Sequence, residues 1–177
     1  APEVICATHG VELTVVDSSH PDQVRAAIGD RLASTVVVVS SKSGSTVETD
    51  SQRRAFEDAF RQAGLDPTRH MVVVTDPGSP LDQQSREAGY RVVNADPTVG
   101  GRYSALTAFG LVPSGLAGAD IERVFGEPPV AEAALDAVGR SVVDGLRGEG
   151  VTGRPDGYHQ TARFREEGSG AGWEAAS

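Results

Sequence analysis

Cysteine, lysine and basic charge are all scarce in this sequence. One cysteine, Cys6, stands among 177 residues, so no internal disulfide can form and a reducing cytoplasm is the simplest location. No apolar run approaches the roughly 20 residues of a membrane span, and no basic start followed by an apolar stretch marks a signal peptide. The net charge of −9 argues against nucleic-acid or membrane binding, which needs clustered Lys and Arg. A local anion pocket is still compatible with that charge.

Length and composition favour one folded domain. A chain of 177 residues can bury a real core, and 38% hydrophobic residues exclude a wholly disordered chain.

Sequence motifs for metal and dinucleotide binding are missing. The four histidines, His9, His20, His70 and His159, show no metal-ligand spacing, and no GxGxxG fingerprint is present. We therefore expect no zinc site and no bound NAD.

Short β-branched runs alternate with helical stretches through the first two thirds of the chain. Such alternation is typical of right-handed βαβ units and a mostly parallel sheet covered on both faces. Ser19 and Ser79 are plausible helix caps, and Gly64 is placed to end a helix. The pattern predicts strands over 11–16, 35–39, 71–74 and 90–93, and helices over 21–32, 46–63, 80–88 and 104–116. The expected fold is α/β, a doubly wound parallel sheet in three layers.

The C-terminal part has a weaker pattern. The pattern over 130–146 predicts one weak helix, and eight glycines fall within 145–177. Few large apolar side chains accompany them, so we expect a mobile or poorly packed tail. The predicted organisation is thus one domain over 1–125 followed by a segment over 126–177.

A run of hydroxyl side chains follows the predicted strand over 35–39 and enters the next helix. It reads SSKSGSTVET over 40–49 and contains Lys42, the only lysine of the chain. Beyond the carboxyl end of a parallel strand, a helix N-terminus with nearby hydroxyls suits a phosphate. The alternative is a helix cap in which Ser45 and Glu48 form a capping box. A cap explains one or two hydroxyls but not six, so the pattern favours a phosphate site.

A second motif, DPTVGGRYS over 96–104, also lies between a strand and a helix. Two glycines beside Arg102 suggest a bent backbone that projects the guanidinium into the same crevice, where it suits an oxyanion. The alternative is a glycine turn with a solvated arginine, and from this pattern alone the two are evenly matched. Asp76 follows a third strand and could line the crevice, although a plain turn is the favoured interpretation.

Together the two motifs resemble the glucose-6-phosphate isomerase family of the sugar isomerase (SIS) fold group. Residues 41–49 look like its phosphate-binding loop, and residues 96–110 look like its glycine-glycine-arginine signature. The surrounding sequence is similar to bacterial members, actinobacterial ones in particular. The resemblance covers about residues 1–125. It implies a flavodoxin-like, SIS-type three-layer α/β/α domain that binds a hexose 6-phosphate.

The resemblance also implies roles for individual residues. Ser41, Ser43, Thr46 and Thr49 would hold the substrate phosphate, with Lys42 in the same loop. Gly101 and Arg102 would lie at the reacting end, where Arg102 would stabilise an enediolate. The family interconverts glucose 6-phosphate and fructose 6-phosphate with a carboxylate base and no cofactor, and it is commonly dimeric.

The sequence departs from the family at both ends. The first strand and its glycine-serine loop are missing, so segments 11–16 and 35–39 must pair directly or receive a strand from elsewhere. After residue 125 we find no match for the family's catalytic Glu, ring-opening His or late Lys. Glu127, Glu132, Glu149 and His159 sit in no matching motif. We therefore expect an isomerase fragment without its base; a non-catalytic phosphosugar-binding module and a degenerate product are the alternatives.

Overall fold

The computed structural model describes residues 1–18, 20–29 and 31–125, together with two strands at 154–158 and 162–165. Its centre is a parallel sheet of three strands, β2 (Val37–Ser40), β3 (Met71–Thr75) and β4 (Arg91–Asn94), in that order. Val37 pairs with Met71, and Val72 pairs with Arg91. The predicted parallel sheet is confirmed, with strand boundaries shifted by one or two residues.

The valines of β2 and β3 alternate between two hydrophobic cores, one on each face of the sheet. Val38, Val72 and Val74 join one core, while Val39 and Val73 join the other. Side chains of successive strand residues point to opposite faces, so a continuous apolar run requires cover on both sides. Each of these valines is essentially fully buried, which contributes about 1.5–3 kcal/mol per side chain.

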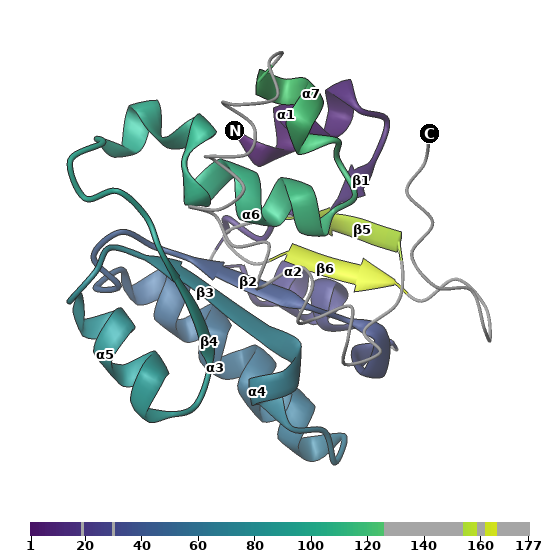
Figure 1. The fold of residues 1–177 in the computed structure, drawn as a ribbon. Helices are drawn as coiled ribbons and strands as arrows, with labels where there is room; N and C mark the ends of the chain where they lie inside the picture. The colour runs from purple at the N-terminus through teal and green to yellow at the C-terminus, as the bar shows by residue number, and fades with distance from the viewer. Residues whose placement is uncertain (19, 30, 126–153, 159–161, 166–177) are drawn as a thin grey trace.

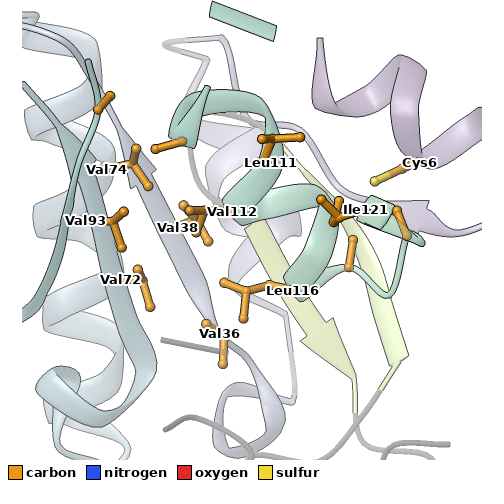
Figure 2. Close-up of a cluster of buried hydrophobic side chains, with 14 residues drawn as sticks. Cys6, Val36, Val38, Val72, Val74, Val93, Leu111, Val112, Leu116 and Ile121 are labelled. Carbon is orange, nitrogen blue, oxygen red and sulfur yellow. The ribbon is translucent and has the colours of Figure 1, made fainter. Parts of the chain in front are cut away.

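Helices supply that cover in two layers (Figure 1). The first core packs under three helices, α1 (Pro2–Thr8), α6 (Ala108–Leu116) and α7 (Ile121–Phe125). Figure 2 shows Val112 and Leu116 of α6 beside Val38 and Val36, with Cys6 of α1 and Ile121 of α7 farther from the sheet. The second core packs under α2 (Pro21–Ile28), α3 (Val47–Gln62) and α5 (Pro80–Glu87), and the short α4 (Pro67–His70) precedes β3. This is the expected three-layer doubly wound arrangement.

Local signals set most helix boundaries. Gly64 follows the end of α3 with a φ of 73°, which glycine adopts without strain. Ser79 caps α5, its hydroxyl accepting a hydrogen bond from the Asp82 amide at 3.0 Å. The Ser19 cap was wrong, because the N-cap of α2 is His20. That helix also ends at Ile28, before Gly29 with its φ of 48°.

The helix predicted over 104–116 is two elements, a 3-10 helix η2 (Gly101–Leu106) and α6. Thr107 separates them with an extended backbone, and its hydroxyl accepts a 3.4 Å hydrogen bond from the Phe109 amide. Gly110 lets the two pack closely, because a Cβ there would lie 1.8 Å from the Ala105 carbonyl oxygen. The prediction of one continuous helix was therefore wrong.

Strand β1 (Glu12–Leu13) is shorter than the predicted 11–16 and does not pair with β2. It pairs in parallel with β5 (Arg154–Tyr158), which pairs antiparallel with β6 (Ala162–Arg165). Segments 11–16 and 35–39 therefore do not pair directly, which was one of the two predicted alternatives. Strand β6 contacts β2, but among the described residues it belongs to a separate sheet and is not paired with it. No sequence pattern predicted β5 or β6, and the predicted helix over 130–146 lies outside the described residues.

The search for a transmembrane segment gave a negative result. In the part of the chain that the structure describes, no helix combines the length and the apolar character that crossing a membrane requires.

Candidate functional site

A pocket of about 530 Å³ lies beyond the carboxyl end of β2. This volume is within the range of small-molecule sites. One wall is the loop from β2 to α3, and the other is η2 with the start of α6. The lining residues are Ala1, Pro2, Ser40, Ser41, Lys42, Ser43, Thr46, Gly101, Arg102, Ser104, Ala105, Phe109 and Gly110. Six of the seven predicted site residues are among them, and Thr49 is not.

The first wall is a compact loop that hydrogen bonds to itself. The Ser41 hydroxyl accepts from the Gly44 amide at 3.1 Å, and the Ser43 and Ser45 hydroxyls lie 2.8 Å apart. Gly44 has a φ of 68° and packs directly against Leu81 of α5. The loop is thus anchored to a neighbouring helix through a residue that has to be glycine.

The start of α3 brings helix amides to the loop. Thr46 is the N-cap, yet its side chain makes no capping hydrogen bond. The predicted alternative, a capping box with Ser45 at the N-cap, is therefore wrong. The first amides of a helix lack partners within the helix and carry the positive end of its dipole. Thr46 lines the pocket beside them, whereas Thr49 is buried with 4% of its surface exposed.

Lys42 crosses the pocket and joins its two walls. Its ammonium donates to Asp76 Oδ1 at 2.9 Å and to the Val99 carbonyl oxygen at 2.9 Å. The same nitrogen lies 5.3 Å from the centroid of the Phe109 ring, within the range of a cation–π contact. The carboxylate of Asp76 therefore balances the charge of Lys42, and two of the three ammonium protons are already used.

The second wall carries a cation without such a partner. Within the described residues, Arg102 makes no ion pair or hydrogen bond, and its side chain is exposed at the pocket. The preceding loop is held by Asp96, which accepts from the Thr98 hydroxyl at 2.7 Å and the Thr98 amide at 2.8 Å. These hydrogen bonds lower the pKa of the Asp96 carboxyl. Arg102 is thus the cation that an anionic ligand can recruit.

Carboxylate and imidazole side chains are missing from the described lining. Among the described residues that line the pocket, none is Asp, Glu or His. Nor do the described residues group three potential metal ligands anywhere. The pocket as described holds donors and cations for an anion but no carboxylate to act as a base.

Sequence reasoning missed part of the site. Ser104 and Phe109 line the pocket; both lie within the motif over 96–110, but neither was predicted to be a site residue. Asp76 was interpreted as a plain turn, and it is the partner of Lys42. One signal could have found it: Asp76 follows β3, the neighbour of β2, and carboxyl ends of adjacent parallel strands meet at one edge of the sheet.

Curated proteins with similar sequences carry one name. The chain is 44% identical over 113 residues to the glucose-6-phosphate isomerase of Rippkaea orientalis and 41% identical over 114 residues to that of a Synechococcus strain. The chain is homologous to part of glucose-6-phosphate isomerase. The match takes in 62% of this chain and 21% of each relative, so the chain spans about a fifth of their length. No family model matches the chain.

Solved structures agree with the sequence comparison. A glucose-6-phosphate isomerase from Chlamydia trachomatis superposes with a TM-score of 0.57 at 27% identity, covering 80% of this chain and 32% of that one. A hypothetical protein from Thermus thermophilus gives 0.52 at 28% identity, over 75% of this chain and 34% of that one. The expected α/β fold of glucose-6-phosphate isomerase is therefore confirmed.

Proposed function

We propose that the pocket binds a hexose 6-phosphate and that this chain serves the interconversion of glucose 6-phosphate and fructose 6-phosphate. The reaction takes place in the cytoplasm, where the single cysteine stays reduced. The phosphate lies on the loop wall, with the hydroxyls of Ser41, Ser43 and Thr46 and the first amides of α3. The sugar carbons extend towards Gly101 and Arg102.

The observation that carries this proposal is the division of the pocket into two kinds of donor. The Thr46 side chain makes no cap, so its hydroxyl and the helix amides are available to a phosphate. Arg102 stands on the opposite wall of the same 530 Å³ pocket with its charge unbalanced by any described residue. A ligand with a phosphate at one end and a second oxygen-rich end fits both walls.

Arg102 has a direct chemical role in this scheme. Moving a proton between C1 and C2 of the open-chain sugar places negative charge on the oxygens of an enediolate. A fixed guanidinium beside those oxygens stabilises the charge as it develops, which commonly supplies several kcal/mol. The phosphate contacts hold the carbons in place, so remote binding energy serves the reacting end.

The proton transfer also needs a base, and no described lining residue supplies one. This observation favours a second candidate function, a phosphosugar-binding module without turnover. In the first candidate, the base comes from residues outside the described lining. The two candidates predict the same ligand and differ only in catalysis, so an activity assay separates them.

Thermal unfolding with and without fructose 6-phosphate tests the shared part. Ligand at 100 times its dissociation constant adds about 2.7 kcal/mol, which raises the midpoint by a few degrees. Unphosphorylated fructose should leave the midpoint unchanged. A double variant, Ser43→Ala with Thr46→Ala, should lose the shift, whereas Ser51→Ala, an exposed hydroxyl within α3 that bonds the Val47 carbonyl, should keep it. If fructose 6-phosphate still raised the unfolding midpoint of the double variant, the proposed phosphate site would be wrong.

The second step is to measure conversion of fructose 6-phosphate to glucose 6-phosphate by the same chain. Turnover that is lost in Arg102→Gln supports the isomerase. Binding without turnover supports the module.

A further inference from the structure

Lys42 is held at both ends by the last residue of β3 and the residue that follows it. Its carbonyl oxygen accepts from the Thr75 hydroxyl at 3.1 Å and from the Asp76 amide at 3.3 Å. Its ammonium returns to the carboxylate of that same Asp76 at 2.9 Å. With 30% of the Lys42 side chain and 22% of the Asp76 side chain exposed, this ion pair is partly shielded from water.

The second bond of the ammonium reaches the opposite wall. Val99, whose carbonyl oxygen it contacts at 2.9 Å, lies 57 positions further along the chain. Gly100 and Gly101 follow at once and lead into Arg102. Two successive glycines have wide backbone freedom, so the position of Arg102 depends on what fixes the residue before them. A Cβ added to Gly101 would lie 3.9 Å from Lys42 Cδ, so the lysine stem also packs against this backbone.

We propose that Asp76 is a positioning residue: through Lys42 it holds the Val99–Arg102 backbone at a fixed distance from the phosphate loop. The distance between the walls matters for a ligand that contacts both of them, so this proposal rests on the proposed function. Asp76 directs the lysine toward the Val99 carbonyl, and so prepares the site for Arg102 to meet the sugar end. Asp76 itself does not line the pocket.

Replacing Asp76 should change the affinity for an anion in the direction opposite to that expected from charge repulsion alone. Asp76 carries a negative charge next to a pocket for an anion. Were it only a nearby charge, Asp76→Asn would tighten anion binding by removing repulsion. As a positioning residue, the same substitution weakens binding, because Lys42 loses its charged partner and the second wall loses its anchor. Glu48→Gln is the matched control. Glu48 is exposed in the first turn of α3 and does not contact Lys42, so its substitution removes one negative charge and leaves the lysine in place.

Amide hydrogen exchange on the full chain tests the positioning without any ligand. In Asp76→Asn, the amides of residues 99–103 should exchange roughly tenfold faster, as expected when a hydrogen bond to a charged group is lost. The amides of β2 and β3 should keep their protection, which shows that the variant is folded. Glu48→Gln should leave residues 99–103 unchanged. Unaltered exchange of these residues in a folded Asp76→Asn would overturn the proposal.

A double-mutant cycle tests whether Asp76 acts through Lys42. Asp76→Asn and Lys42→Met should each weaken fructose 6-phosphate binding, the former by roughly three- to tenfold, and the double variant should be no weaker than Lys42→Met. Additive losses, or tighter binding by Asp76→Asn, would contradict the proposal. If the unsubstituted chain does not bind fructose 6-phosphate at all, the proposed function fails and the exchange experiment alone decides the positioning role.

Discussion

Gly44 and Leu81 touch so closely that a side chain at Gly44 has no room. A β-carbon there would lie 2.2 Å from Leu81 Cβ and 3.1 Å from Leu81 Cα. Gly44 also has a φ of 68°, a region that costs other residues roughly 1–2 kcal/mol. The loop from β2 to α3 therefore owes its shape to a contact with α5, which contributes no residue to the described pocket lining.

Gly44→Ala should destabilise the protein by at least about 2 kcal/mol, because backbone strain and a steric clash add at the same residue. Urea unfolding measures the change. Gly64→Ala is the matched control, since Gly64 has a φ of 73° and no heavy atom lies within 4 Å of the position that a Cβ would take. Its cost should be that of the backbone alone, about 1 kcal/mol. Equal losses in the two variants would show that the Leu81 contact does not matter.

Arg102→Gln should weaken fructose 6-phosphate binding by about 10- to 100-fold. The substitution keeps much of the length and polarity of the side chain but removes charge-assisted hydrogen bonds, each contributing about 1.5–3 kcal/mol. Titration calorimetry measures the affinity, and the midpoint of unfolding without ligand should not change, because Arg102 is exposed.

Arg69→Gln serves as its control. Arg69 is an exposed arginine of α4 that does not line the pocket. The Arg69→Gln substitution removes the same unit of charge from the molecule, so the affinity for fructose 6-phosphate should stay within about twofold of the original. A comparable loss in both variants would mean that overall charge, rather than a positioned guanidinium, attracts the ligand.

Asp82 should make stability depend on pH on the acid side. Its carboxylate accepts from the Gly78 amide at 2.8 Å, from Arg86 Nε at 2.8 Å and from Asn94 Nδ2 at 3.1 Å. The Gly78 hydrogen bond above all holds the pKa of Asp82 below its ordinary value. A lowered pKa contributes stability that is present above the unfolded value, roughly 3.9, and is lost as pH falls through the folded value.

Asp82→Asn should therefore cost about 1.5–3 kcal/mol at neutral pH, and the difference from the unsubstituted protein should shrink below about pH 4. Denaturant unfolding at several pH values measures it. Asp58→Asn, an exposed residue with a 3.5 Å contact to Arg61, should cost less than about 1 kcal/mol at every pH. A loss at Asp82 that is constant with pH would contradict the assignment.

Cys6 should be inert while the protein is folded. Only 1% of its surface is exposed, and burial raises the pKa of its thiol to about 11. The thiolate is the reactive form, so at about pH 8 only roughly a thousandth of the thiol is ionised. A thiol-reactive disulfide reagent should label the native protein at least about 100-fold more slowly than the protein in guanidinium chloride. Rapid native labelling would show that α1 opens easily.

Local patterns predicted the sheet and several helix ends because local chemistry decides them. The continuous valines before Ser40 and after His70 can only be buried strands, and they pair as β2 and β3. Ser79 followed by Pro80 is a favoured helix start, and it begins α5. The two glycine- and serine-rich motifs also identified six residues that do share one pocket.

The remaining features depend on contacts between distant segments. Thr107 is a possible N-cap within a stretch that otherwise has a helical pattern, and the break there is accompanied by the close packing of the Ala105 carbonyl on Gly110. The hydroxyl of Thr49 matches the motif, but its place on α3 turns it away from the pocket and into the protein. Lys42 finds Asp76 across 34 positions, a pairing that only the order of the strands creates.

The position of Lys42 also has a practical consequence for handling the protein. It is the only lysine in the sequence and it lines the pocket, so dyes, biotin esters and sensor surfaces that react with side-chain amines will all attach inside the site. Cys6, the only cysteine in the sequence, is buried in the hydrophobic core. Neither of the two usual conjugation chemistries has a harmless target, and a label that leaves the pocket open has to be introduced on the exposed face of a helix such as α5.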